Sequence, residues 1–380
     1  MIPVYRPSLG DRERAYVNEC LDSNWISSKG AFIERFEGAF ADFVGAERAL
    51  SVCNGTVAVH LALAALGIGP GDEVLVPTLT YVASVNPILQ LGARPVFVDS
   101  LAGTLQMDPA DARRRVTPRT KAVVAVHLYG HPCDMDALVA LCAEHDLRLV
   151  EDCAEAFGTL WRGRHVGSFG DLATYSFYGN KTITTGEGGM VTGRRGPLLD
   201  RAHLLKTQGL SPGREYWHEV AGYNFRMTNI CAAIGLAQLE RADALLERKR
   251  AIAGWYAELL AGLPLSLHGE AREARQSYWM CSAILDRAAD RKPLREHLAA
   301  GGVETRPFFP CVHQMPPYAG LAGALPVAED LSARGLNLPS YPDLTRVEVA
   351  SVAGLVRAHF APAAAGPRLR ALDGVQAALP

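Results

Sequence analysis

The chain has 380 residues, of which 49% are apolar and 21% charged, and its formal net charge is −2. This balance is typical of a soluble globular protein of about two domains, and it excludes a strongly basic surface for nucleic acid or an anionic membrane. The Met1 end, MIPVYRPSLG, has neither the basic nor the apolar region of a secretion signal, and no apolar run reaches the roughly 18 residues of a membrane span.

The eight cysteines are scattered along the chain without a CxxC pair. In a chain of this length, such scatter predicts reduced thiols and a cytoplasmic protein. Cysteines and histidines do not cluster at ligand spacing, so we expect no metal site. His127 and His131, in HLYGHPCDMD, are therefore interpreted as structural residues.

From residue 51 to residue 192, short apolar runs alternate with helical patterns. A helix is predicted over Thr56–Leu66, directly after Asn54 and Gly55, and another over Asp134–Asp146. Nearly continuous apolar composition predicts buried strands in DEVLVP, ARPVFVD, KAVVAVHLYG, LRLVED and LATYSFY. This alternation is typical of an α/β fold with a mostly parallel sheet and helices on both faces.

After Gly222 the pattern becomes helical for more than thirty residues, over 227–260. We expect a domain boundary within this stretch, which gives a large domain of residues 1–242 and a small C-terminal domain of residues 243–380. Further helices are predicted near Lys292–Ala300, Val327–Ala333 and Arg346–His359. The Ala/Pro-rich tail, 361–380, is predicted to be partly disordered.

Polar residues follow the ends of several predicted strands, where parallel sheets bind their ligands. Asn54, Gly55 and Thr56 stand where the first predicted helix opens. Free backbone N–H groups and the positive end of the helix dipole at Gly55 and Thr56 suit a phosphate, and the hydroxyl of Ser176 can add to them. A plain strand-to-helix turn is the alternative interpretation of Asn54–Thr56.

Three further strand-end residues suit an aromatic aldehyde. Tyr81 offers a face to a flat ring, Asp152 can keep a ring nitrogen protonated, and Lys181 can form a Schiff base. Burial of Lys181 would lower its pKa and keep the amine neutral. Together with the phosphate site, this combination predicts pyridoxal phosphate. Taken singly, each residue has a structural alternative: packing for Tyr81, a helix cap for Asp152 and a surface loop for Lys181.

The motifs SFYGNKTITTGEGG, VEDCAEAFG, GYNFRMTNICAAIGLAQLE and VCNGTVAVHLALAALGIGPGDEVLVPTLTYVAS resemble the DegT/DnrJ/EryC1/StrS sugar aminotransferases over nearly the whole chain. The resemblance implies the fold of the fold-type-I pyridoxal-phosphate aminotransferases. That fold has a mostly parallel seven-stranded sheet in the large domain and a smaller α+β C-terminal domain. It also implies a homodimer with the active site between the subunits.

The resemblance further implies roles for individual residues. Lys181 would carry the cofactor and, once released, move the proton; some relatives have His there and are dehydratases, so Lys181 favours transamination. Asp152 would pair with the pyridinium nitrogen, and Tyr81 would stack on the ring. Glu155 would lie near the ring hydroxyl, where many relatives carry Gln or His. The phosphate would be bound by Gly55, Thr56, Ser176 and the partner subunit's Asn224.

Within the family, WISSKGAFIERFE, Tyr178–Gly189 and ARGLNLPSYPDLT look most like members that move an amino group from L-glutamate to carbon 4 of GDP-4-keto-6-deoxymannose. Segment 1–35, with its WISSKG loop, would line the sugar pocket. The candidate substrate contacts are Trp25, Ser27, Lys29, Arg226, Arg306, His313 and Tyr318. The structural alternatives are a connecting loop for WISSKG, an ion pair for Arg226 and a rigid Pro-rich surface loop for the last three residues.

Three other functions compete with this hypothesis. The first is an aminotransferase for another nucleotide ketosugar, dTDP- or UDP-linked, at carbon 3 or 4. The second is a non-catalytic protein that binds a ligand with the same fold, although such regulators normally add a DNA-binding module for which the chain has no room. The third is a nicotinamide dehydrogenase, which the absence of GxGxxG after the first strand disfavours.

Overall fold

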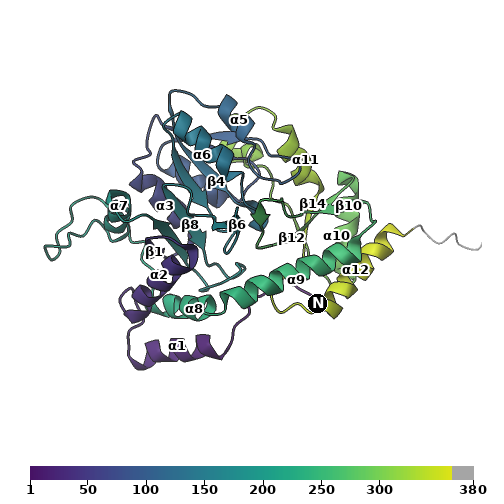
Figure 1. Cartoon of the computed structure of the whole chain (residues 1–380), viewed down its shortest axis with the longest axis horizontal. Helices are drawn as coiled ribbons and strands as arrows, with labels where there is room; N and C mark the ends of the chain where they lie inside the picture. The colour runs from purple at the N-terminus through teal and green to yellow at the C-terminus, as the bar shows by residue number, and fades with distance from the viewer. Residues whose placement is uncertain (362–380) are drawn as a thin grey trace, which may run out of the picture.

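The computed structural model describes residues 1–361 (Figure 1). The predicted disorder of the tail beyond residue 361 lies outside the described residues. Within residues 1–361, no helix combines the length and the apolar content that a membrane span requires.

A seven-stranded sheet forms the centre of the molecule, in the order β1-β9-β8-β5-β4-β2-β3. All its strands are parallel except β9, which pairs antiparallel with both β8 and β1. The prediction of a mostly parallel sheet is therefore confirmed. The strands are β1 (Arg48–Val52), β2 (Glu73–Pro77), β3 (Arg94–Val98), β4 (Thr120–Val126), β5 (Arg148–Asp152), β8 (Leu172–Ser176) and β9 (Gly189–Gly193).

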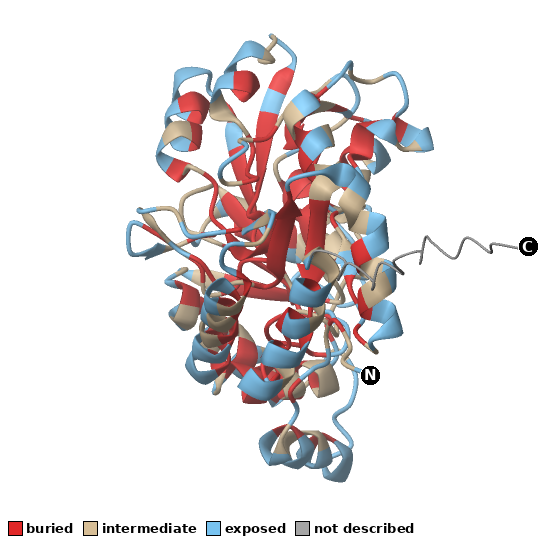
Figure 2. Ribbon diagram, turned by 90° about the vertical axis from the view of Figure 1, so that its right-hand side faces the viewer, coloured by how far each residue is buried: buried red, intermediate tan, exposed pale blue. Residues whose placement is uncertain are grey.

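Two hydrophobic cores cover the two faces of this sheet. Along β4, Val123 and Ala125 join one core, and Ala122 and Val124 join the other, because successive strand side chains point to opposite faces. Figure 2 shows the resulting buried strands between helices that are exposed on their outer sides. Helices α2 (Ala31–Val44), α6 (Met135–Glu144) and α8 (Asn229–Leu239) contribute to the first core; α3 (Gly55–Ala65), α4 (Asn86–Gln90) and α7 (Pro197–Lys206) contribute to the second.

The long helical stretch predicted over 227–260 is two helices, α8 and α9 (Ala242–Leu260), so the expectation of one continuous helix is wrong at residues 240–241. Arg241 leaves the helical conformation, with φ −112° and ψ 8°. Its guanidinium contacts Glu13 of α1 (Asp11–Asp22) at 3.3 Å and the hydroxyl of Ser8 at 3.2 Å. The break between α8 and α9 therefore coincides with tertiary contacts to the N-terminal segment. No Gly or Pro marks it in the sequence.

A second sheet lies after residue 264, antiparallel throughout, in the order β10-β12-β14-β13. Its strands are β10 (Leu265–Leu267), β12 (Cys281–Leu285), β13 (Arg306–Pro307) and β14 (Gly335–Leu338), and its helices are α10 (Arg291–Ala300), α11 (Pro326–Arg334) and α12 (Arg346–Phe360). The three helices lie at the predicted places. The domain boundary at residue 242 stays a prediction.

The N-terminal residues lie beside this second sheet. Ile2 forms a bridge with Val303, and the backbone N–H of Ser340 donates to the carbonyl of Val4 at 3.2 Å. Residues from the two ends of the described chain therefore meet. Figure 1 places the N-terminus near α9 and α12.

Candidate active site

A cavity of about 880 Å³ opens at the carboxyl ends of the parallel strands. Residues that follow β1, β2, β4, β5 and β8 form one side of it, and residues of the second sheet form the other. The cavity brings together the following residues predicted from the sequence: Gly55, Thr56, Tyr81, Asp152, Glu155, Ser176, Lys181 and Arg306.

One end of the cavity is the N-terminus of α3. The side chain of Asn54 caps this helix by accepting from the backbone N–H of Val57 at 3.0 Å. The N–H groups of Gly55 and Thr56 belong to the first helical turn and have no intrahelical acceptor. A Cβ atom on Gly55 would lie 2.6 Å from the Cβ of Ser176, so only glycine permits this approach. The donors and the helix dipole here suit a phosphate.

Asp152 is the last residue of β5 and only 3% exposed. Its carboxylate accepts hydrogen bonds from the Ser84 hydroxyl at 2.7 Å and from the backbone N–H of Ala154 at 3.0 Å. These two bonds fix the carboxylate on the cavity wall. An acceptor held in this way can bind a protonated ring nitrogen.

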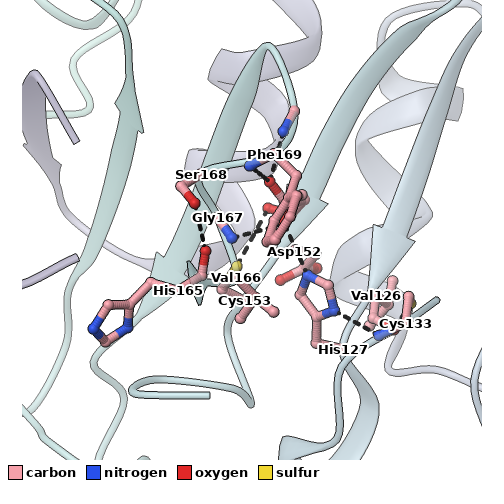
Figure 3. A network of polar contacts seen from close by, with 12 residues as sticks. Val126, His127, Cys133, Asp152, Cys153, His165, Val166, Gly167, Ser168 and Phe169 are labelled. Carbon is pink, nitrogen blue, oxygen red and sulfur yellow. Dashed lines mark hydrogen bonds and ion pairs between the residues drawn. The ribbon is translucent and has the colours of Figure 1, made fainter. Parts of the chain in front are cut away.

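The neighbouring Glu151 has a different environment, because adjacent strand residues face opposite sides of the sheet. Its Oε2 lies 3.2 Å from His127 Nε2, and His127 Nδ1 accepts from the backbone N–H of Cys133 at 3.0 Å. Figure 3 shows this network around the strand ends. Both carboxylate oxygens also accept backbone N–H bonds at 2.7 Å, from Gly167, Phe169 and Gly170. Every nitrogen and oxygen of the His127–Glu151 pair is thus occupied, which agrees with a structural role.

Lys181 follows β8, and its ammonium group projects toward Glu155 and an indole ring. Its Nζ lies 3.9 Å from Glu155 Oε1 and 3.9 Å from the centre of the Trp279 ring, and its side chain is 13% exposed. Burial lowers the pKa of Lys181, and the carboxylates of Glu155 and Asp152 oppose this effect. The lowered pKa favours the neutral amine that nucleophilic and base chemistry requires.

Glu155 is the acidic partner of Lys181. Burial raises the pKa of Glu155 to about 7, while Lys181 and the backbone N–H of Tyr129, which donates at 2.9 Å, act in the opposite direction. The nearby Asp152 carboxylate adds to the rise. Glu155 can therefore hold or release a proton near neutral pH beside the amine.

Side chains from distant segments fix the backbone around Lys181. The hydroxyl of Tyr5 donates to the Lys181 carbonyl at 2.6 Å, and the indole N–H of Trp279 donates to the Asn180 carbonyl at 2.7 Å. Sequence reasoning missed both residues. It also missed Phe309 and Asn337 in the cavity wall, although Asn337 lies in ARGLNLPSYPDLT, one of the segments that carry the family resemblance.

Seven predicted residues lie outside this cavity. The loop with Trp25, Ser27 and Lys29 is exposed; Asn229 holds its backbone by donating to the Trp25 carbonyl from the side chain at 2.7 Å and to the Ser27 carbonyl from the backbone at 2.6 Å. Two others form a pair in which the exposed amide oxygen of Asn224 accepts from Arg226 at 3.2 Å.

His313 and Tyr318 are buried and do not line the cavity either. His313 Nδ1 lies 2.7 Å from the Thr78 hydroxyl and Nε2 lies 3.2 Å from Glu329 Oε1. The Tyr318 hydroxyl donates to Asn86. The structure therefore supports neither residue as a substrate contact, because their polar atoms already bind protein groups.

The chain is similar to known proteins in both sequence and structure. The GDP-perosamine synthases of Escherichia coli O157:H7 and Vibrio cholerae are 55% and 50% identical to the chain; the alignments cover 92% and 95% of it, and 95% and 99% of these relatives. The solved PLP form of the putative sugar aminotransferase Spr1654 from Streptococcus pneumoniae superimposes with a TM-score of 0.89 at 27% identity, over 93% of this chain and 96% of that one. Residues 7–357 match the DegT/DnrJ/EryC1/StrS aminotransferase family, and the chain belongs to that family.

Proposed function

We propose that the protein is a pyridoxal-phosphate-dependent aminotransferase that moves an amino group from L-glutamate to carbon 4 of GDP-4-keto-6-deoxymannose, forming GDP-perosamine. The observation that carries the reaction type is the buried amine of Lys181, which shares one cavity with the Asp152 carboxylate and the N-terminus of α3. The GDP-linked substrate rests on the 55% and 50% identity to GDP-perosamine synthases.

The residues of the cavity fit the cofactor at each of its functional groups. Gly55, Thr56 and Ser176 would hold the phosphate, Asp152 the ring nitrogen, and Tyr81 the ring face. When bound, the cofactor supplies an electron sink for the carbon that loses or gains a proton. Asp152 favours this role because a buried carboxylate stabilises a protonated ring.

Lys181 is the residue that moves the proton. Its lowered pKa leaves a neutral amine able to accept a proton from the substrate carbon, and the same group can return that proton. Glu155, with a pKa of about 7, lies 3.9 Å away and stabilises the ammonium form between these two events.

The wall opposite the strand ends limits the access of water and offers a cation. Trp279 and Phe309 give this wall an aromatic surface, against which Tyr129 packs from the strand-end side, and these rings keep the reacting atoms in a dry environment. The exposed guanidinium of Arg306 lies at the cavity and can bind a diphosphate or a substrate carboxylate.

Assembly as a homodimer would bring the residues outside the cavity into use. Asn224, Arg226 and the 25–30 loop are accessible on one subunit, and Trp25 and Trp217 are exposed by 55% and 49%. Exposed aromatic side chains of this size support a protein interface. The partner subunit's Asn224 would then reach the phosphate. Light scattering should give twice the mass of one chain.

All eight cysteines are free, which supports a cytoplasmic location.

The first test is the visible absorbance of the purified protein before and after borohydride. We expect a coloured protein in which borohydride fixes the cofactor mass on the Lys181 peptide, with no such mass in Lys181→Met and an unchanged result in Lys29→Met. A colourless protein that takes up no added pyridoxal phosphate would contradict the aminotransferase function and favour a non-catalytic binding protein.

The second test offers GDP-, dTDP- and UDP-linked ketosugars to the holoenzyme with L-glutamate. The proposal expects kcat/KM to be largest for GDP-4-keto-6-deoxymannose. A preference for another nucleotide, or for a 3-keto sugar, would overturn the assignment of GDP-perosamine as the product. It would leave the aminotransferase reaction itself unchanged.

A further inference from the structure

Trp279 contacts both the amine and the backbone of the lysine loop. Its indole face lies over Lys181, with 3.9 Å between Nζ and the ring centre, and the residue is 4% exposed. Its indole N–H donates to the carbonyl of Asn180, the residue before the lysine, at 2.7 Å. One side chain therefore constrains the reactive nitrogen and the peptide that carries it.

Trp279 is itself held from behind. Its carbonyl accepts a hydrogen bond from Nζ of the fully buried Lys249 at 2.9 Å. Lys249 also donates to the carbonyl of Ser340 and, at 3.0 Å, to its hydroxyl. The indole ring also stacks near Tyr129, with 6.2 Å between the ring centres and an interplanar angle of 22°. Lys249 of α9 thus holds the backbone of Trp279, and Tyr129 in the turn after β4 packs near its indole.

We propose that Trp279 is a positioning residue for Lys181, which holds the amine with its indole face and the lysine loop with its indole N–H, so that Nζ keeps a fixed place during proton transfer. This inference rests on the proposed aminotransferase function. It concerns a residue two positions before β12, in the loop that leads into the second sheet; this residue makes no hydrogen bond to the Lys181 side chain and belongs to no motif in the sequence.

The charges around Lys181 determine what the ring contributes. The carboxylates of Asp152 and Glu155 act on the amine directly, and the cavity that contains it is also lined by Glu187, Arg306 and His60. An aromatic face attracts an ammonium group because its quadrupole is negative there. The ring therefore favours the charged form of Lys181, against the effect of burial, and its loss lowers the pKa of the amine.

The experiment compares Trp279→Met, which fills much of the space without a ring, with Trp279→Phe, which keeps a ring but lacks the N–H. Trp255→Phe is the matched control, because Trp255 also lies over a cation, Arg248 at 5.2 Å, but does not line the cavity. The pKa of Lys181 is measured in the full-length protein freed of cofactor. Competitive acetylation over a pH series is followed by mass spectrometry of the Lys181 peptide relative to the exposed Lys29 peptide.

We expect Trp279→Met to lower the pKa of Lys181 by about half a unit to one unit. Its kcat falls about tenfold with KM unchanged, since the amine is no longer fixed. In Trp279→Phe, the pKa of Lys181 stays close to its wild-type value because a ring remains. The kcat of this variant falls in part, because the hydrogen bond to the Asn180 carbonyl is lost. Trp255→Phe changes neither quantity.

An unchanged or raised pKa in Trp279→Met, or a KM effect without a kcat effect, would overturn the proposal and leave Trp279 as a packing residue. If Trp279→Met does not fold, a wild-type kcat in Trp279→Phe would overturn the role of the N–H. The acetylation measurement needs neither cofactor nor substrate. A wrong substrate assignment is therefore distinguishable from a wrong role for Trp279.

Discussion

Two buried lysines, Lys181 and Lys249, have different surroundings. Burial lowers the pKa of both, and it lowers that of Lys249 to about 8. The ammonium of Lys249 donates to the carbonyls of Trp279 and Ser340 and to the Ser340 hydroxyl. Within residues 1–361, Nζ of Lys181 makes no hydrogen bond, and the carboxylate of Glu155 remains 3.9 Å away. A buried lysine whose donors are all satisfied contributes to the fold, whereas one left unbonded keeps its amine available for reaction.

The largest effect should separate the two lysines by activity. Lys181→Met should lower kcat by about 10³-fold or more, because the proposed proton-transfer group is lost. Its free energy of unfolding without cofactor should change by less than about 1 kcal/mol or rise, since a buried charge without a hydrogen bond is removed. Turnover assays and urea unfolding measure the two quantities. A large loss of stability would show that the amine is structural after all.

Lys249→Met should show the opposite behaviour. Removing the ammonium leaves the carbonyls of Trp279 and Ser340 buried without a donor, and the free energy of unfolding should fall by about 3 kcal/mol at pH 7. The measurement is urea unfolding, with Lys181→Met as the matched control. Equal stability of the two variants would remove the distinction between the lysines.

Glu155 is a further difference between the two lysines, because its carboxylate lies beside Lys181 and not beside Lys249. The pKa of Glu155 rises from 4.5 to about 7 on folding, so the folded state favours the protonated acid. Its contribution to stability is complete below pH 4.5 and is lost as the pH rises through 7. Between these values, the stability of wild type relative to Glu155→Gln should fall by on the order of 2 kcal/mol in the cofactor-free protein. A constant difference across this range would contradict the raised pKa.

The smallest effect concerns the backbone of the lysine loop. Tyr5→Phe removes the 2.6 Å hydrogen bond to the Lys181 carbonyl and should cost about 1 kcal/mol of unfolding free energy, with a kcat lowered severalfold at constant KM. Tyr16→Phe, which loses a 3.0 Å bond to the exposed Glu240, is the control and should leave kcat unchanged. Identical kcat values in both variants would mean that Tyr5 does not position the loop.

Much of the sheet and of the cofactor site could be predicted because both depend on local patterns. Apolar runs such as LRLVED mark the parallel strands, and the polar residues after them, Asp152 among them, meet at one edge by the geometry of a parallel sheet. The capped start of α3 follows in the same way from Asn54. Local sequence therefore predicted the strands and which residues meet at the cavity, whereas the roles of those residues stay predictions.

The other wall of the cavity depends on how the second sheet packs against the first, and no short pattern encodes that packing. Trp279 and Lys249 look like ordinary apolar and helical residues in the sequence, and only tertiary contacts bring Trp279 to Lys181 and Lys249 to Trp279. The positions of His313 and Tyr318 were likewise not predictable from a local pattern. Their Pro-rich loop suggested substrate contacts, but their polar atoms are used within the protein.

The contacts of the first residues have a consequence for the order of folding. Ile2 pairs with Val303, Val4 accepts from Ser340, and Tyr5 reaches the carbonyl of Lys181. Residues 2–5 emerge from the ribosome long before the segments that hold them, and contacts between such distant parts of a chain form slowly. The lysine loop is therefore completed late. A chain arrested before residue 303 would contain every strand of the large sheet and still lack the contacts that complete the loop of Lys181.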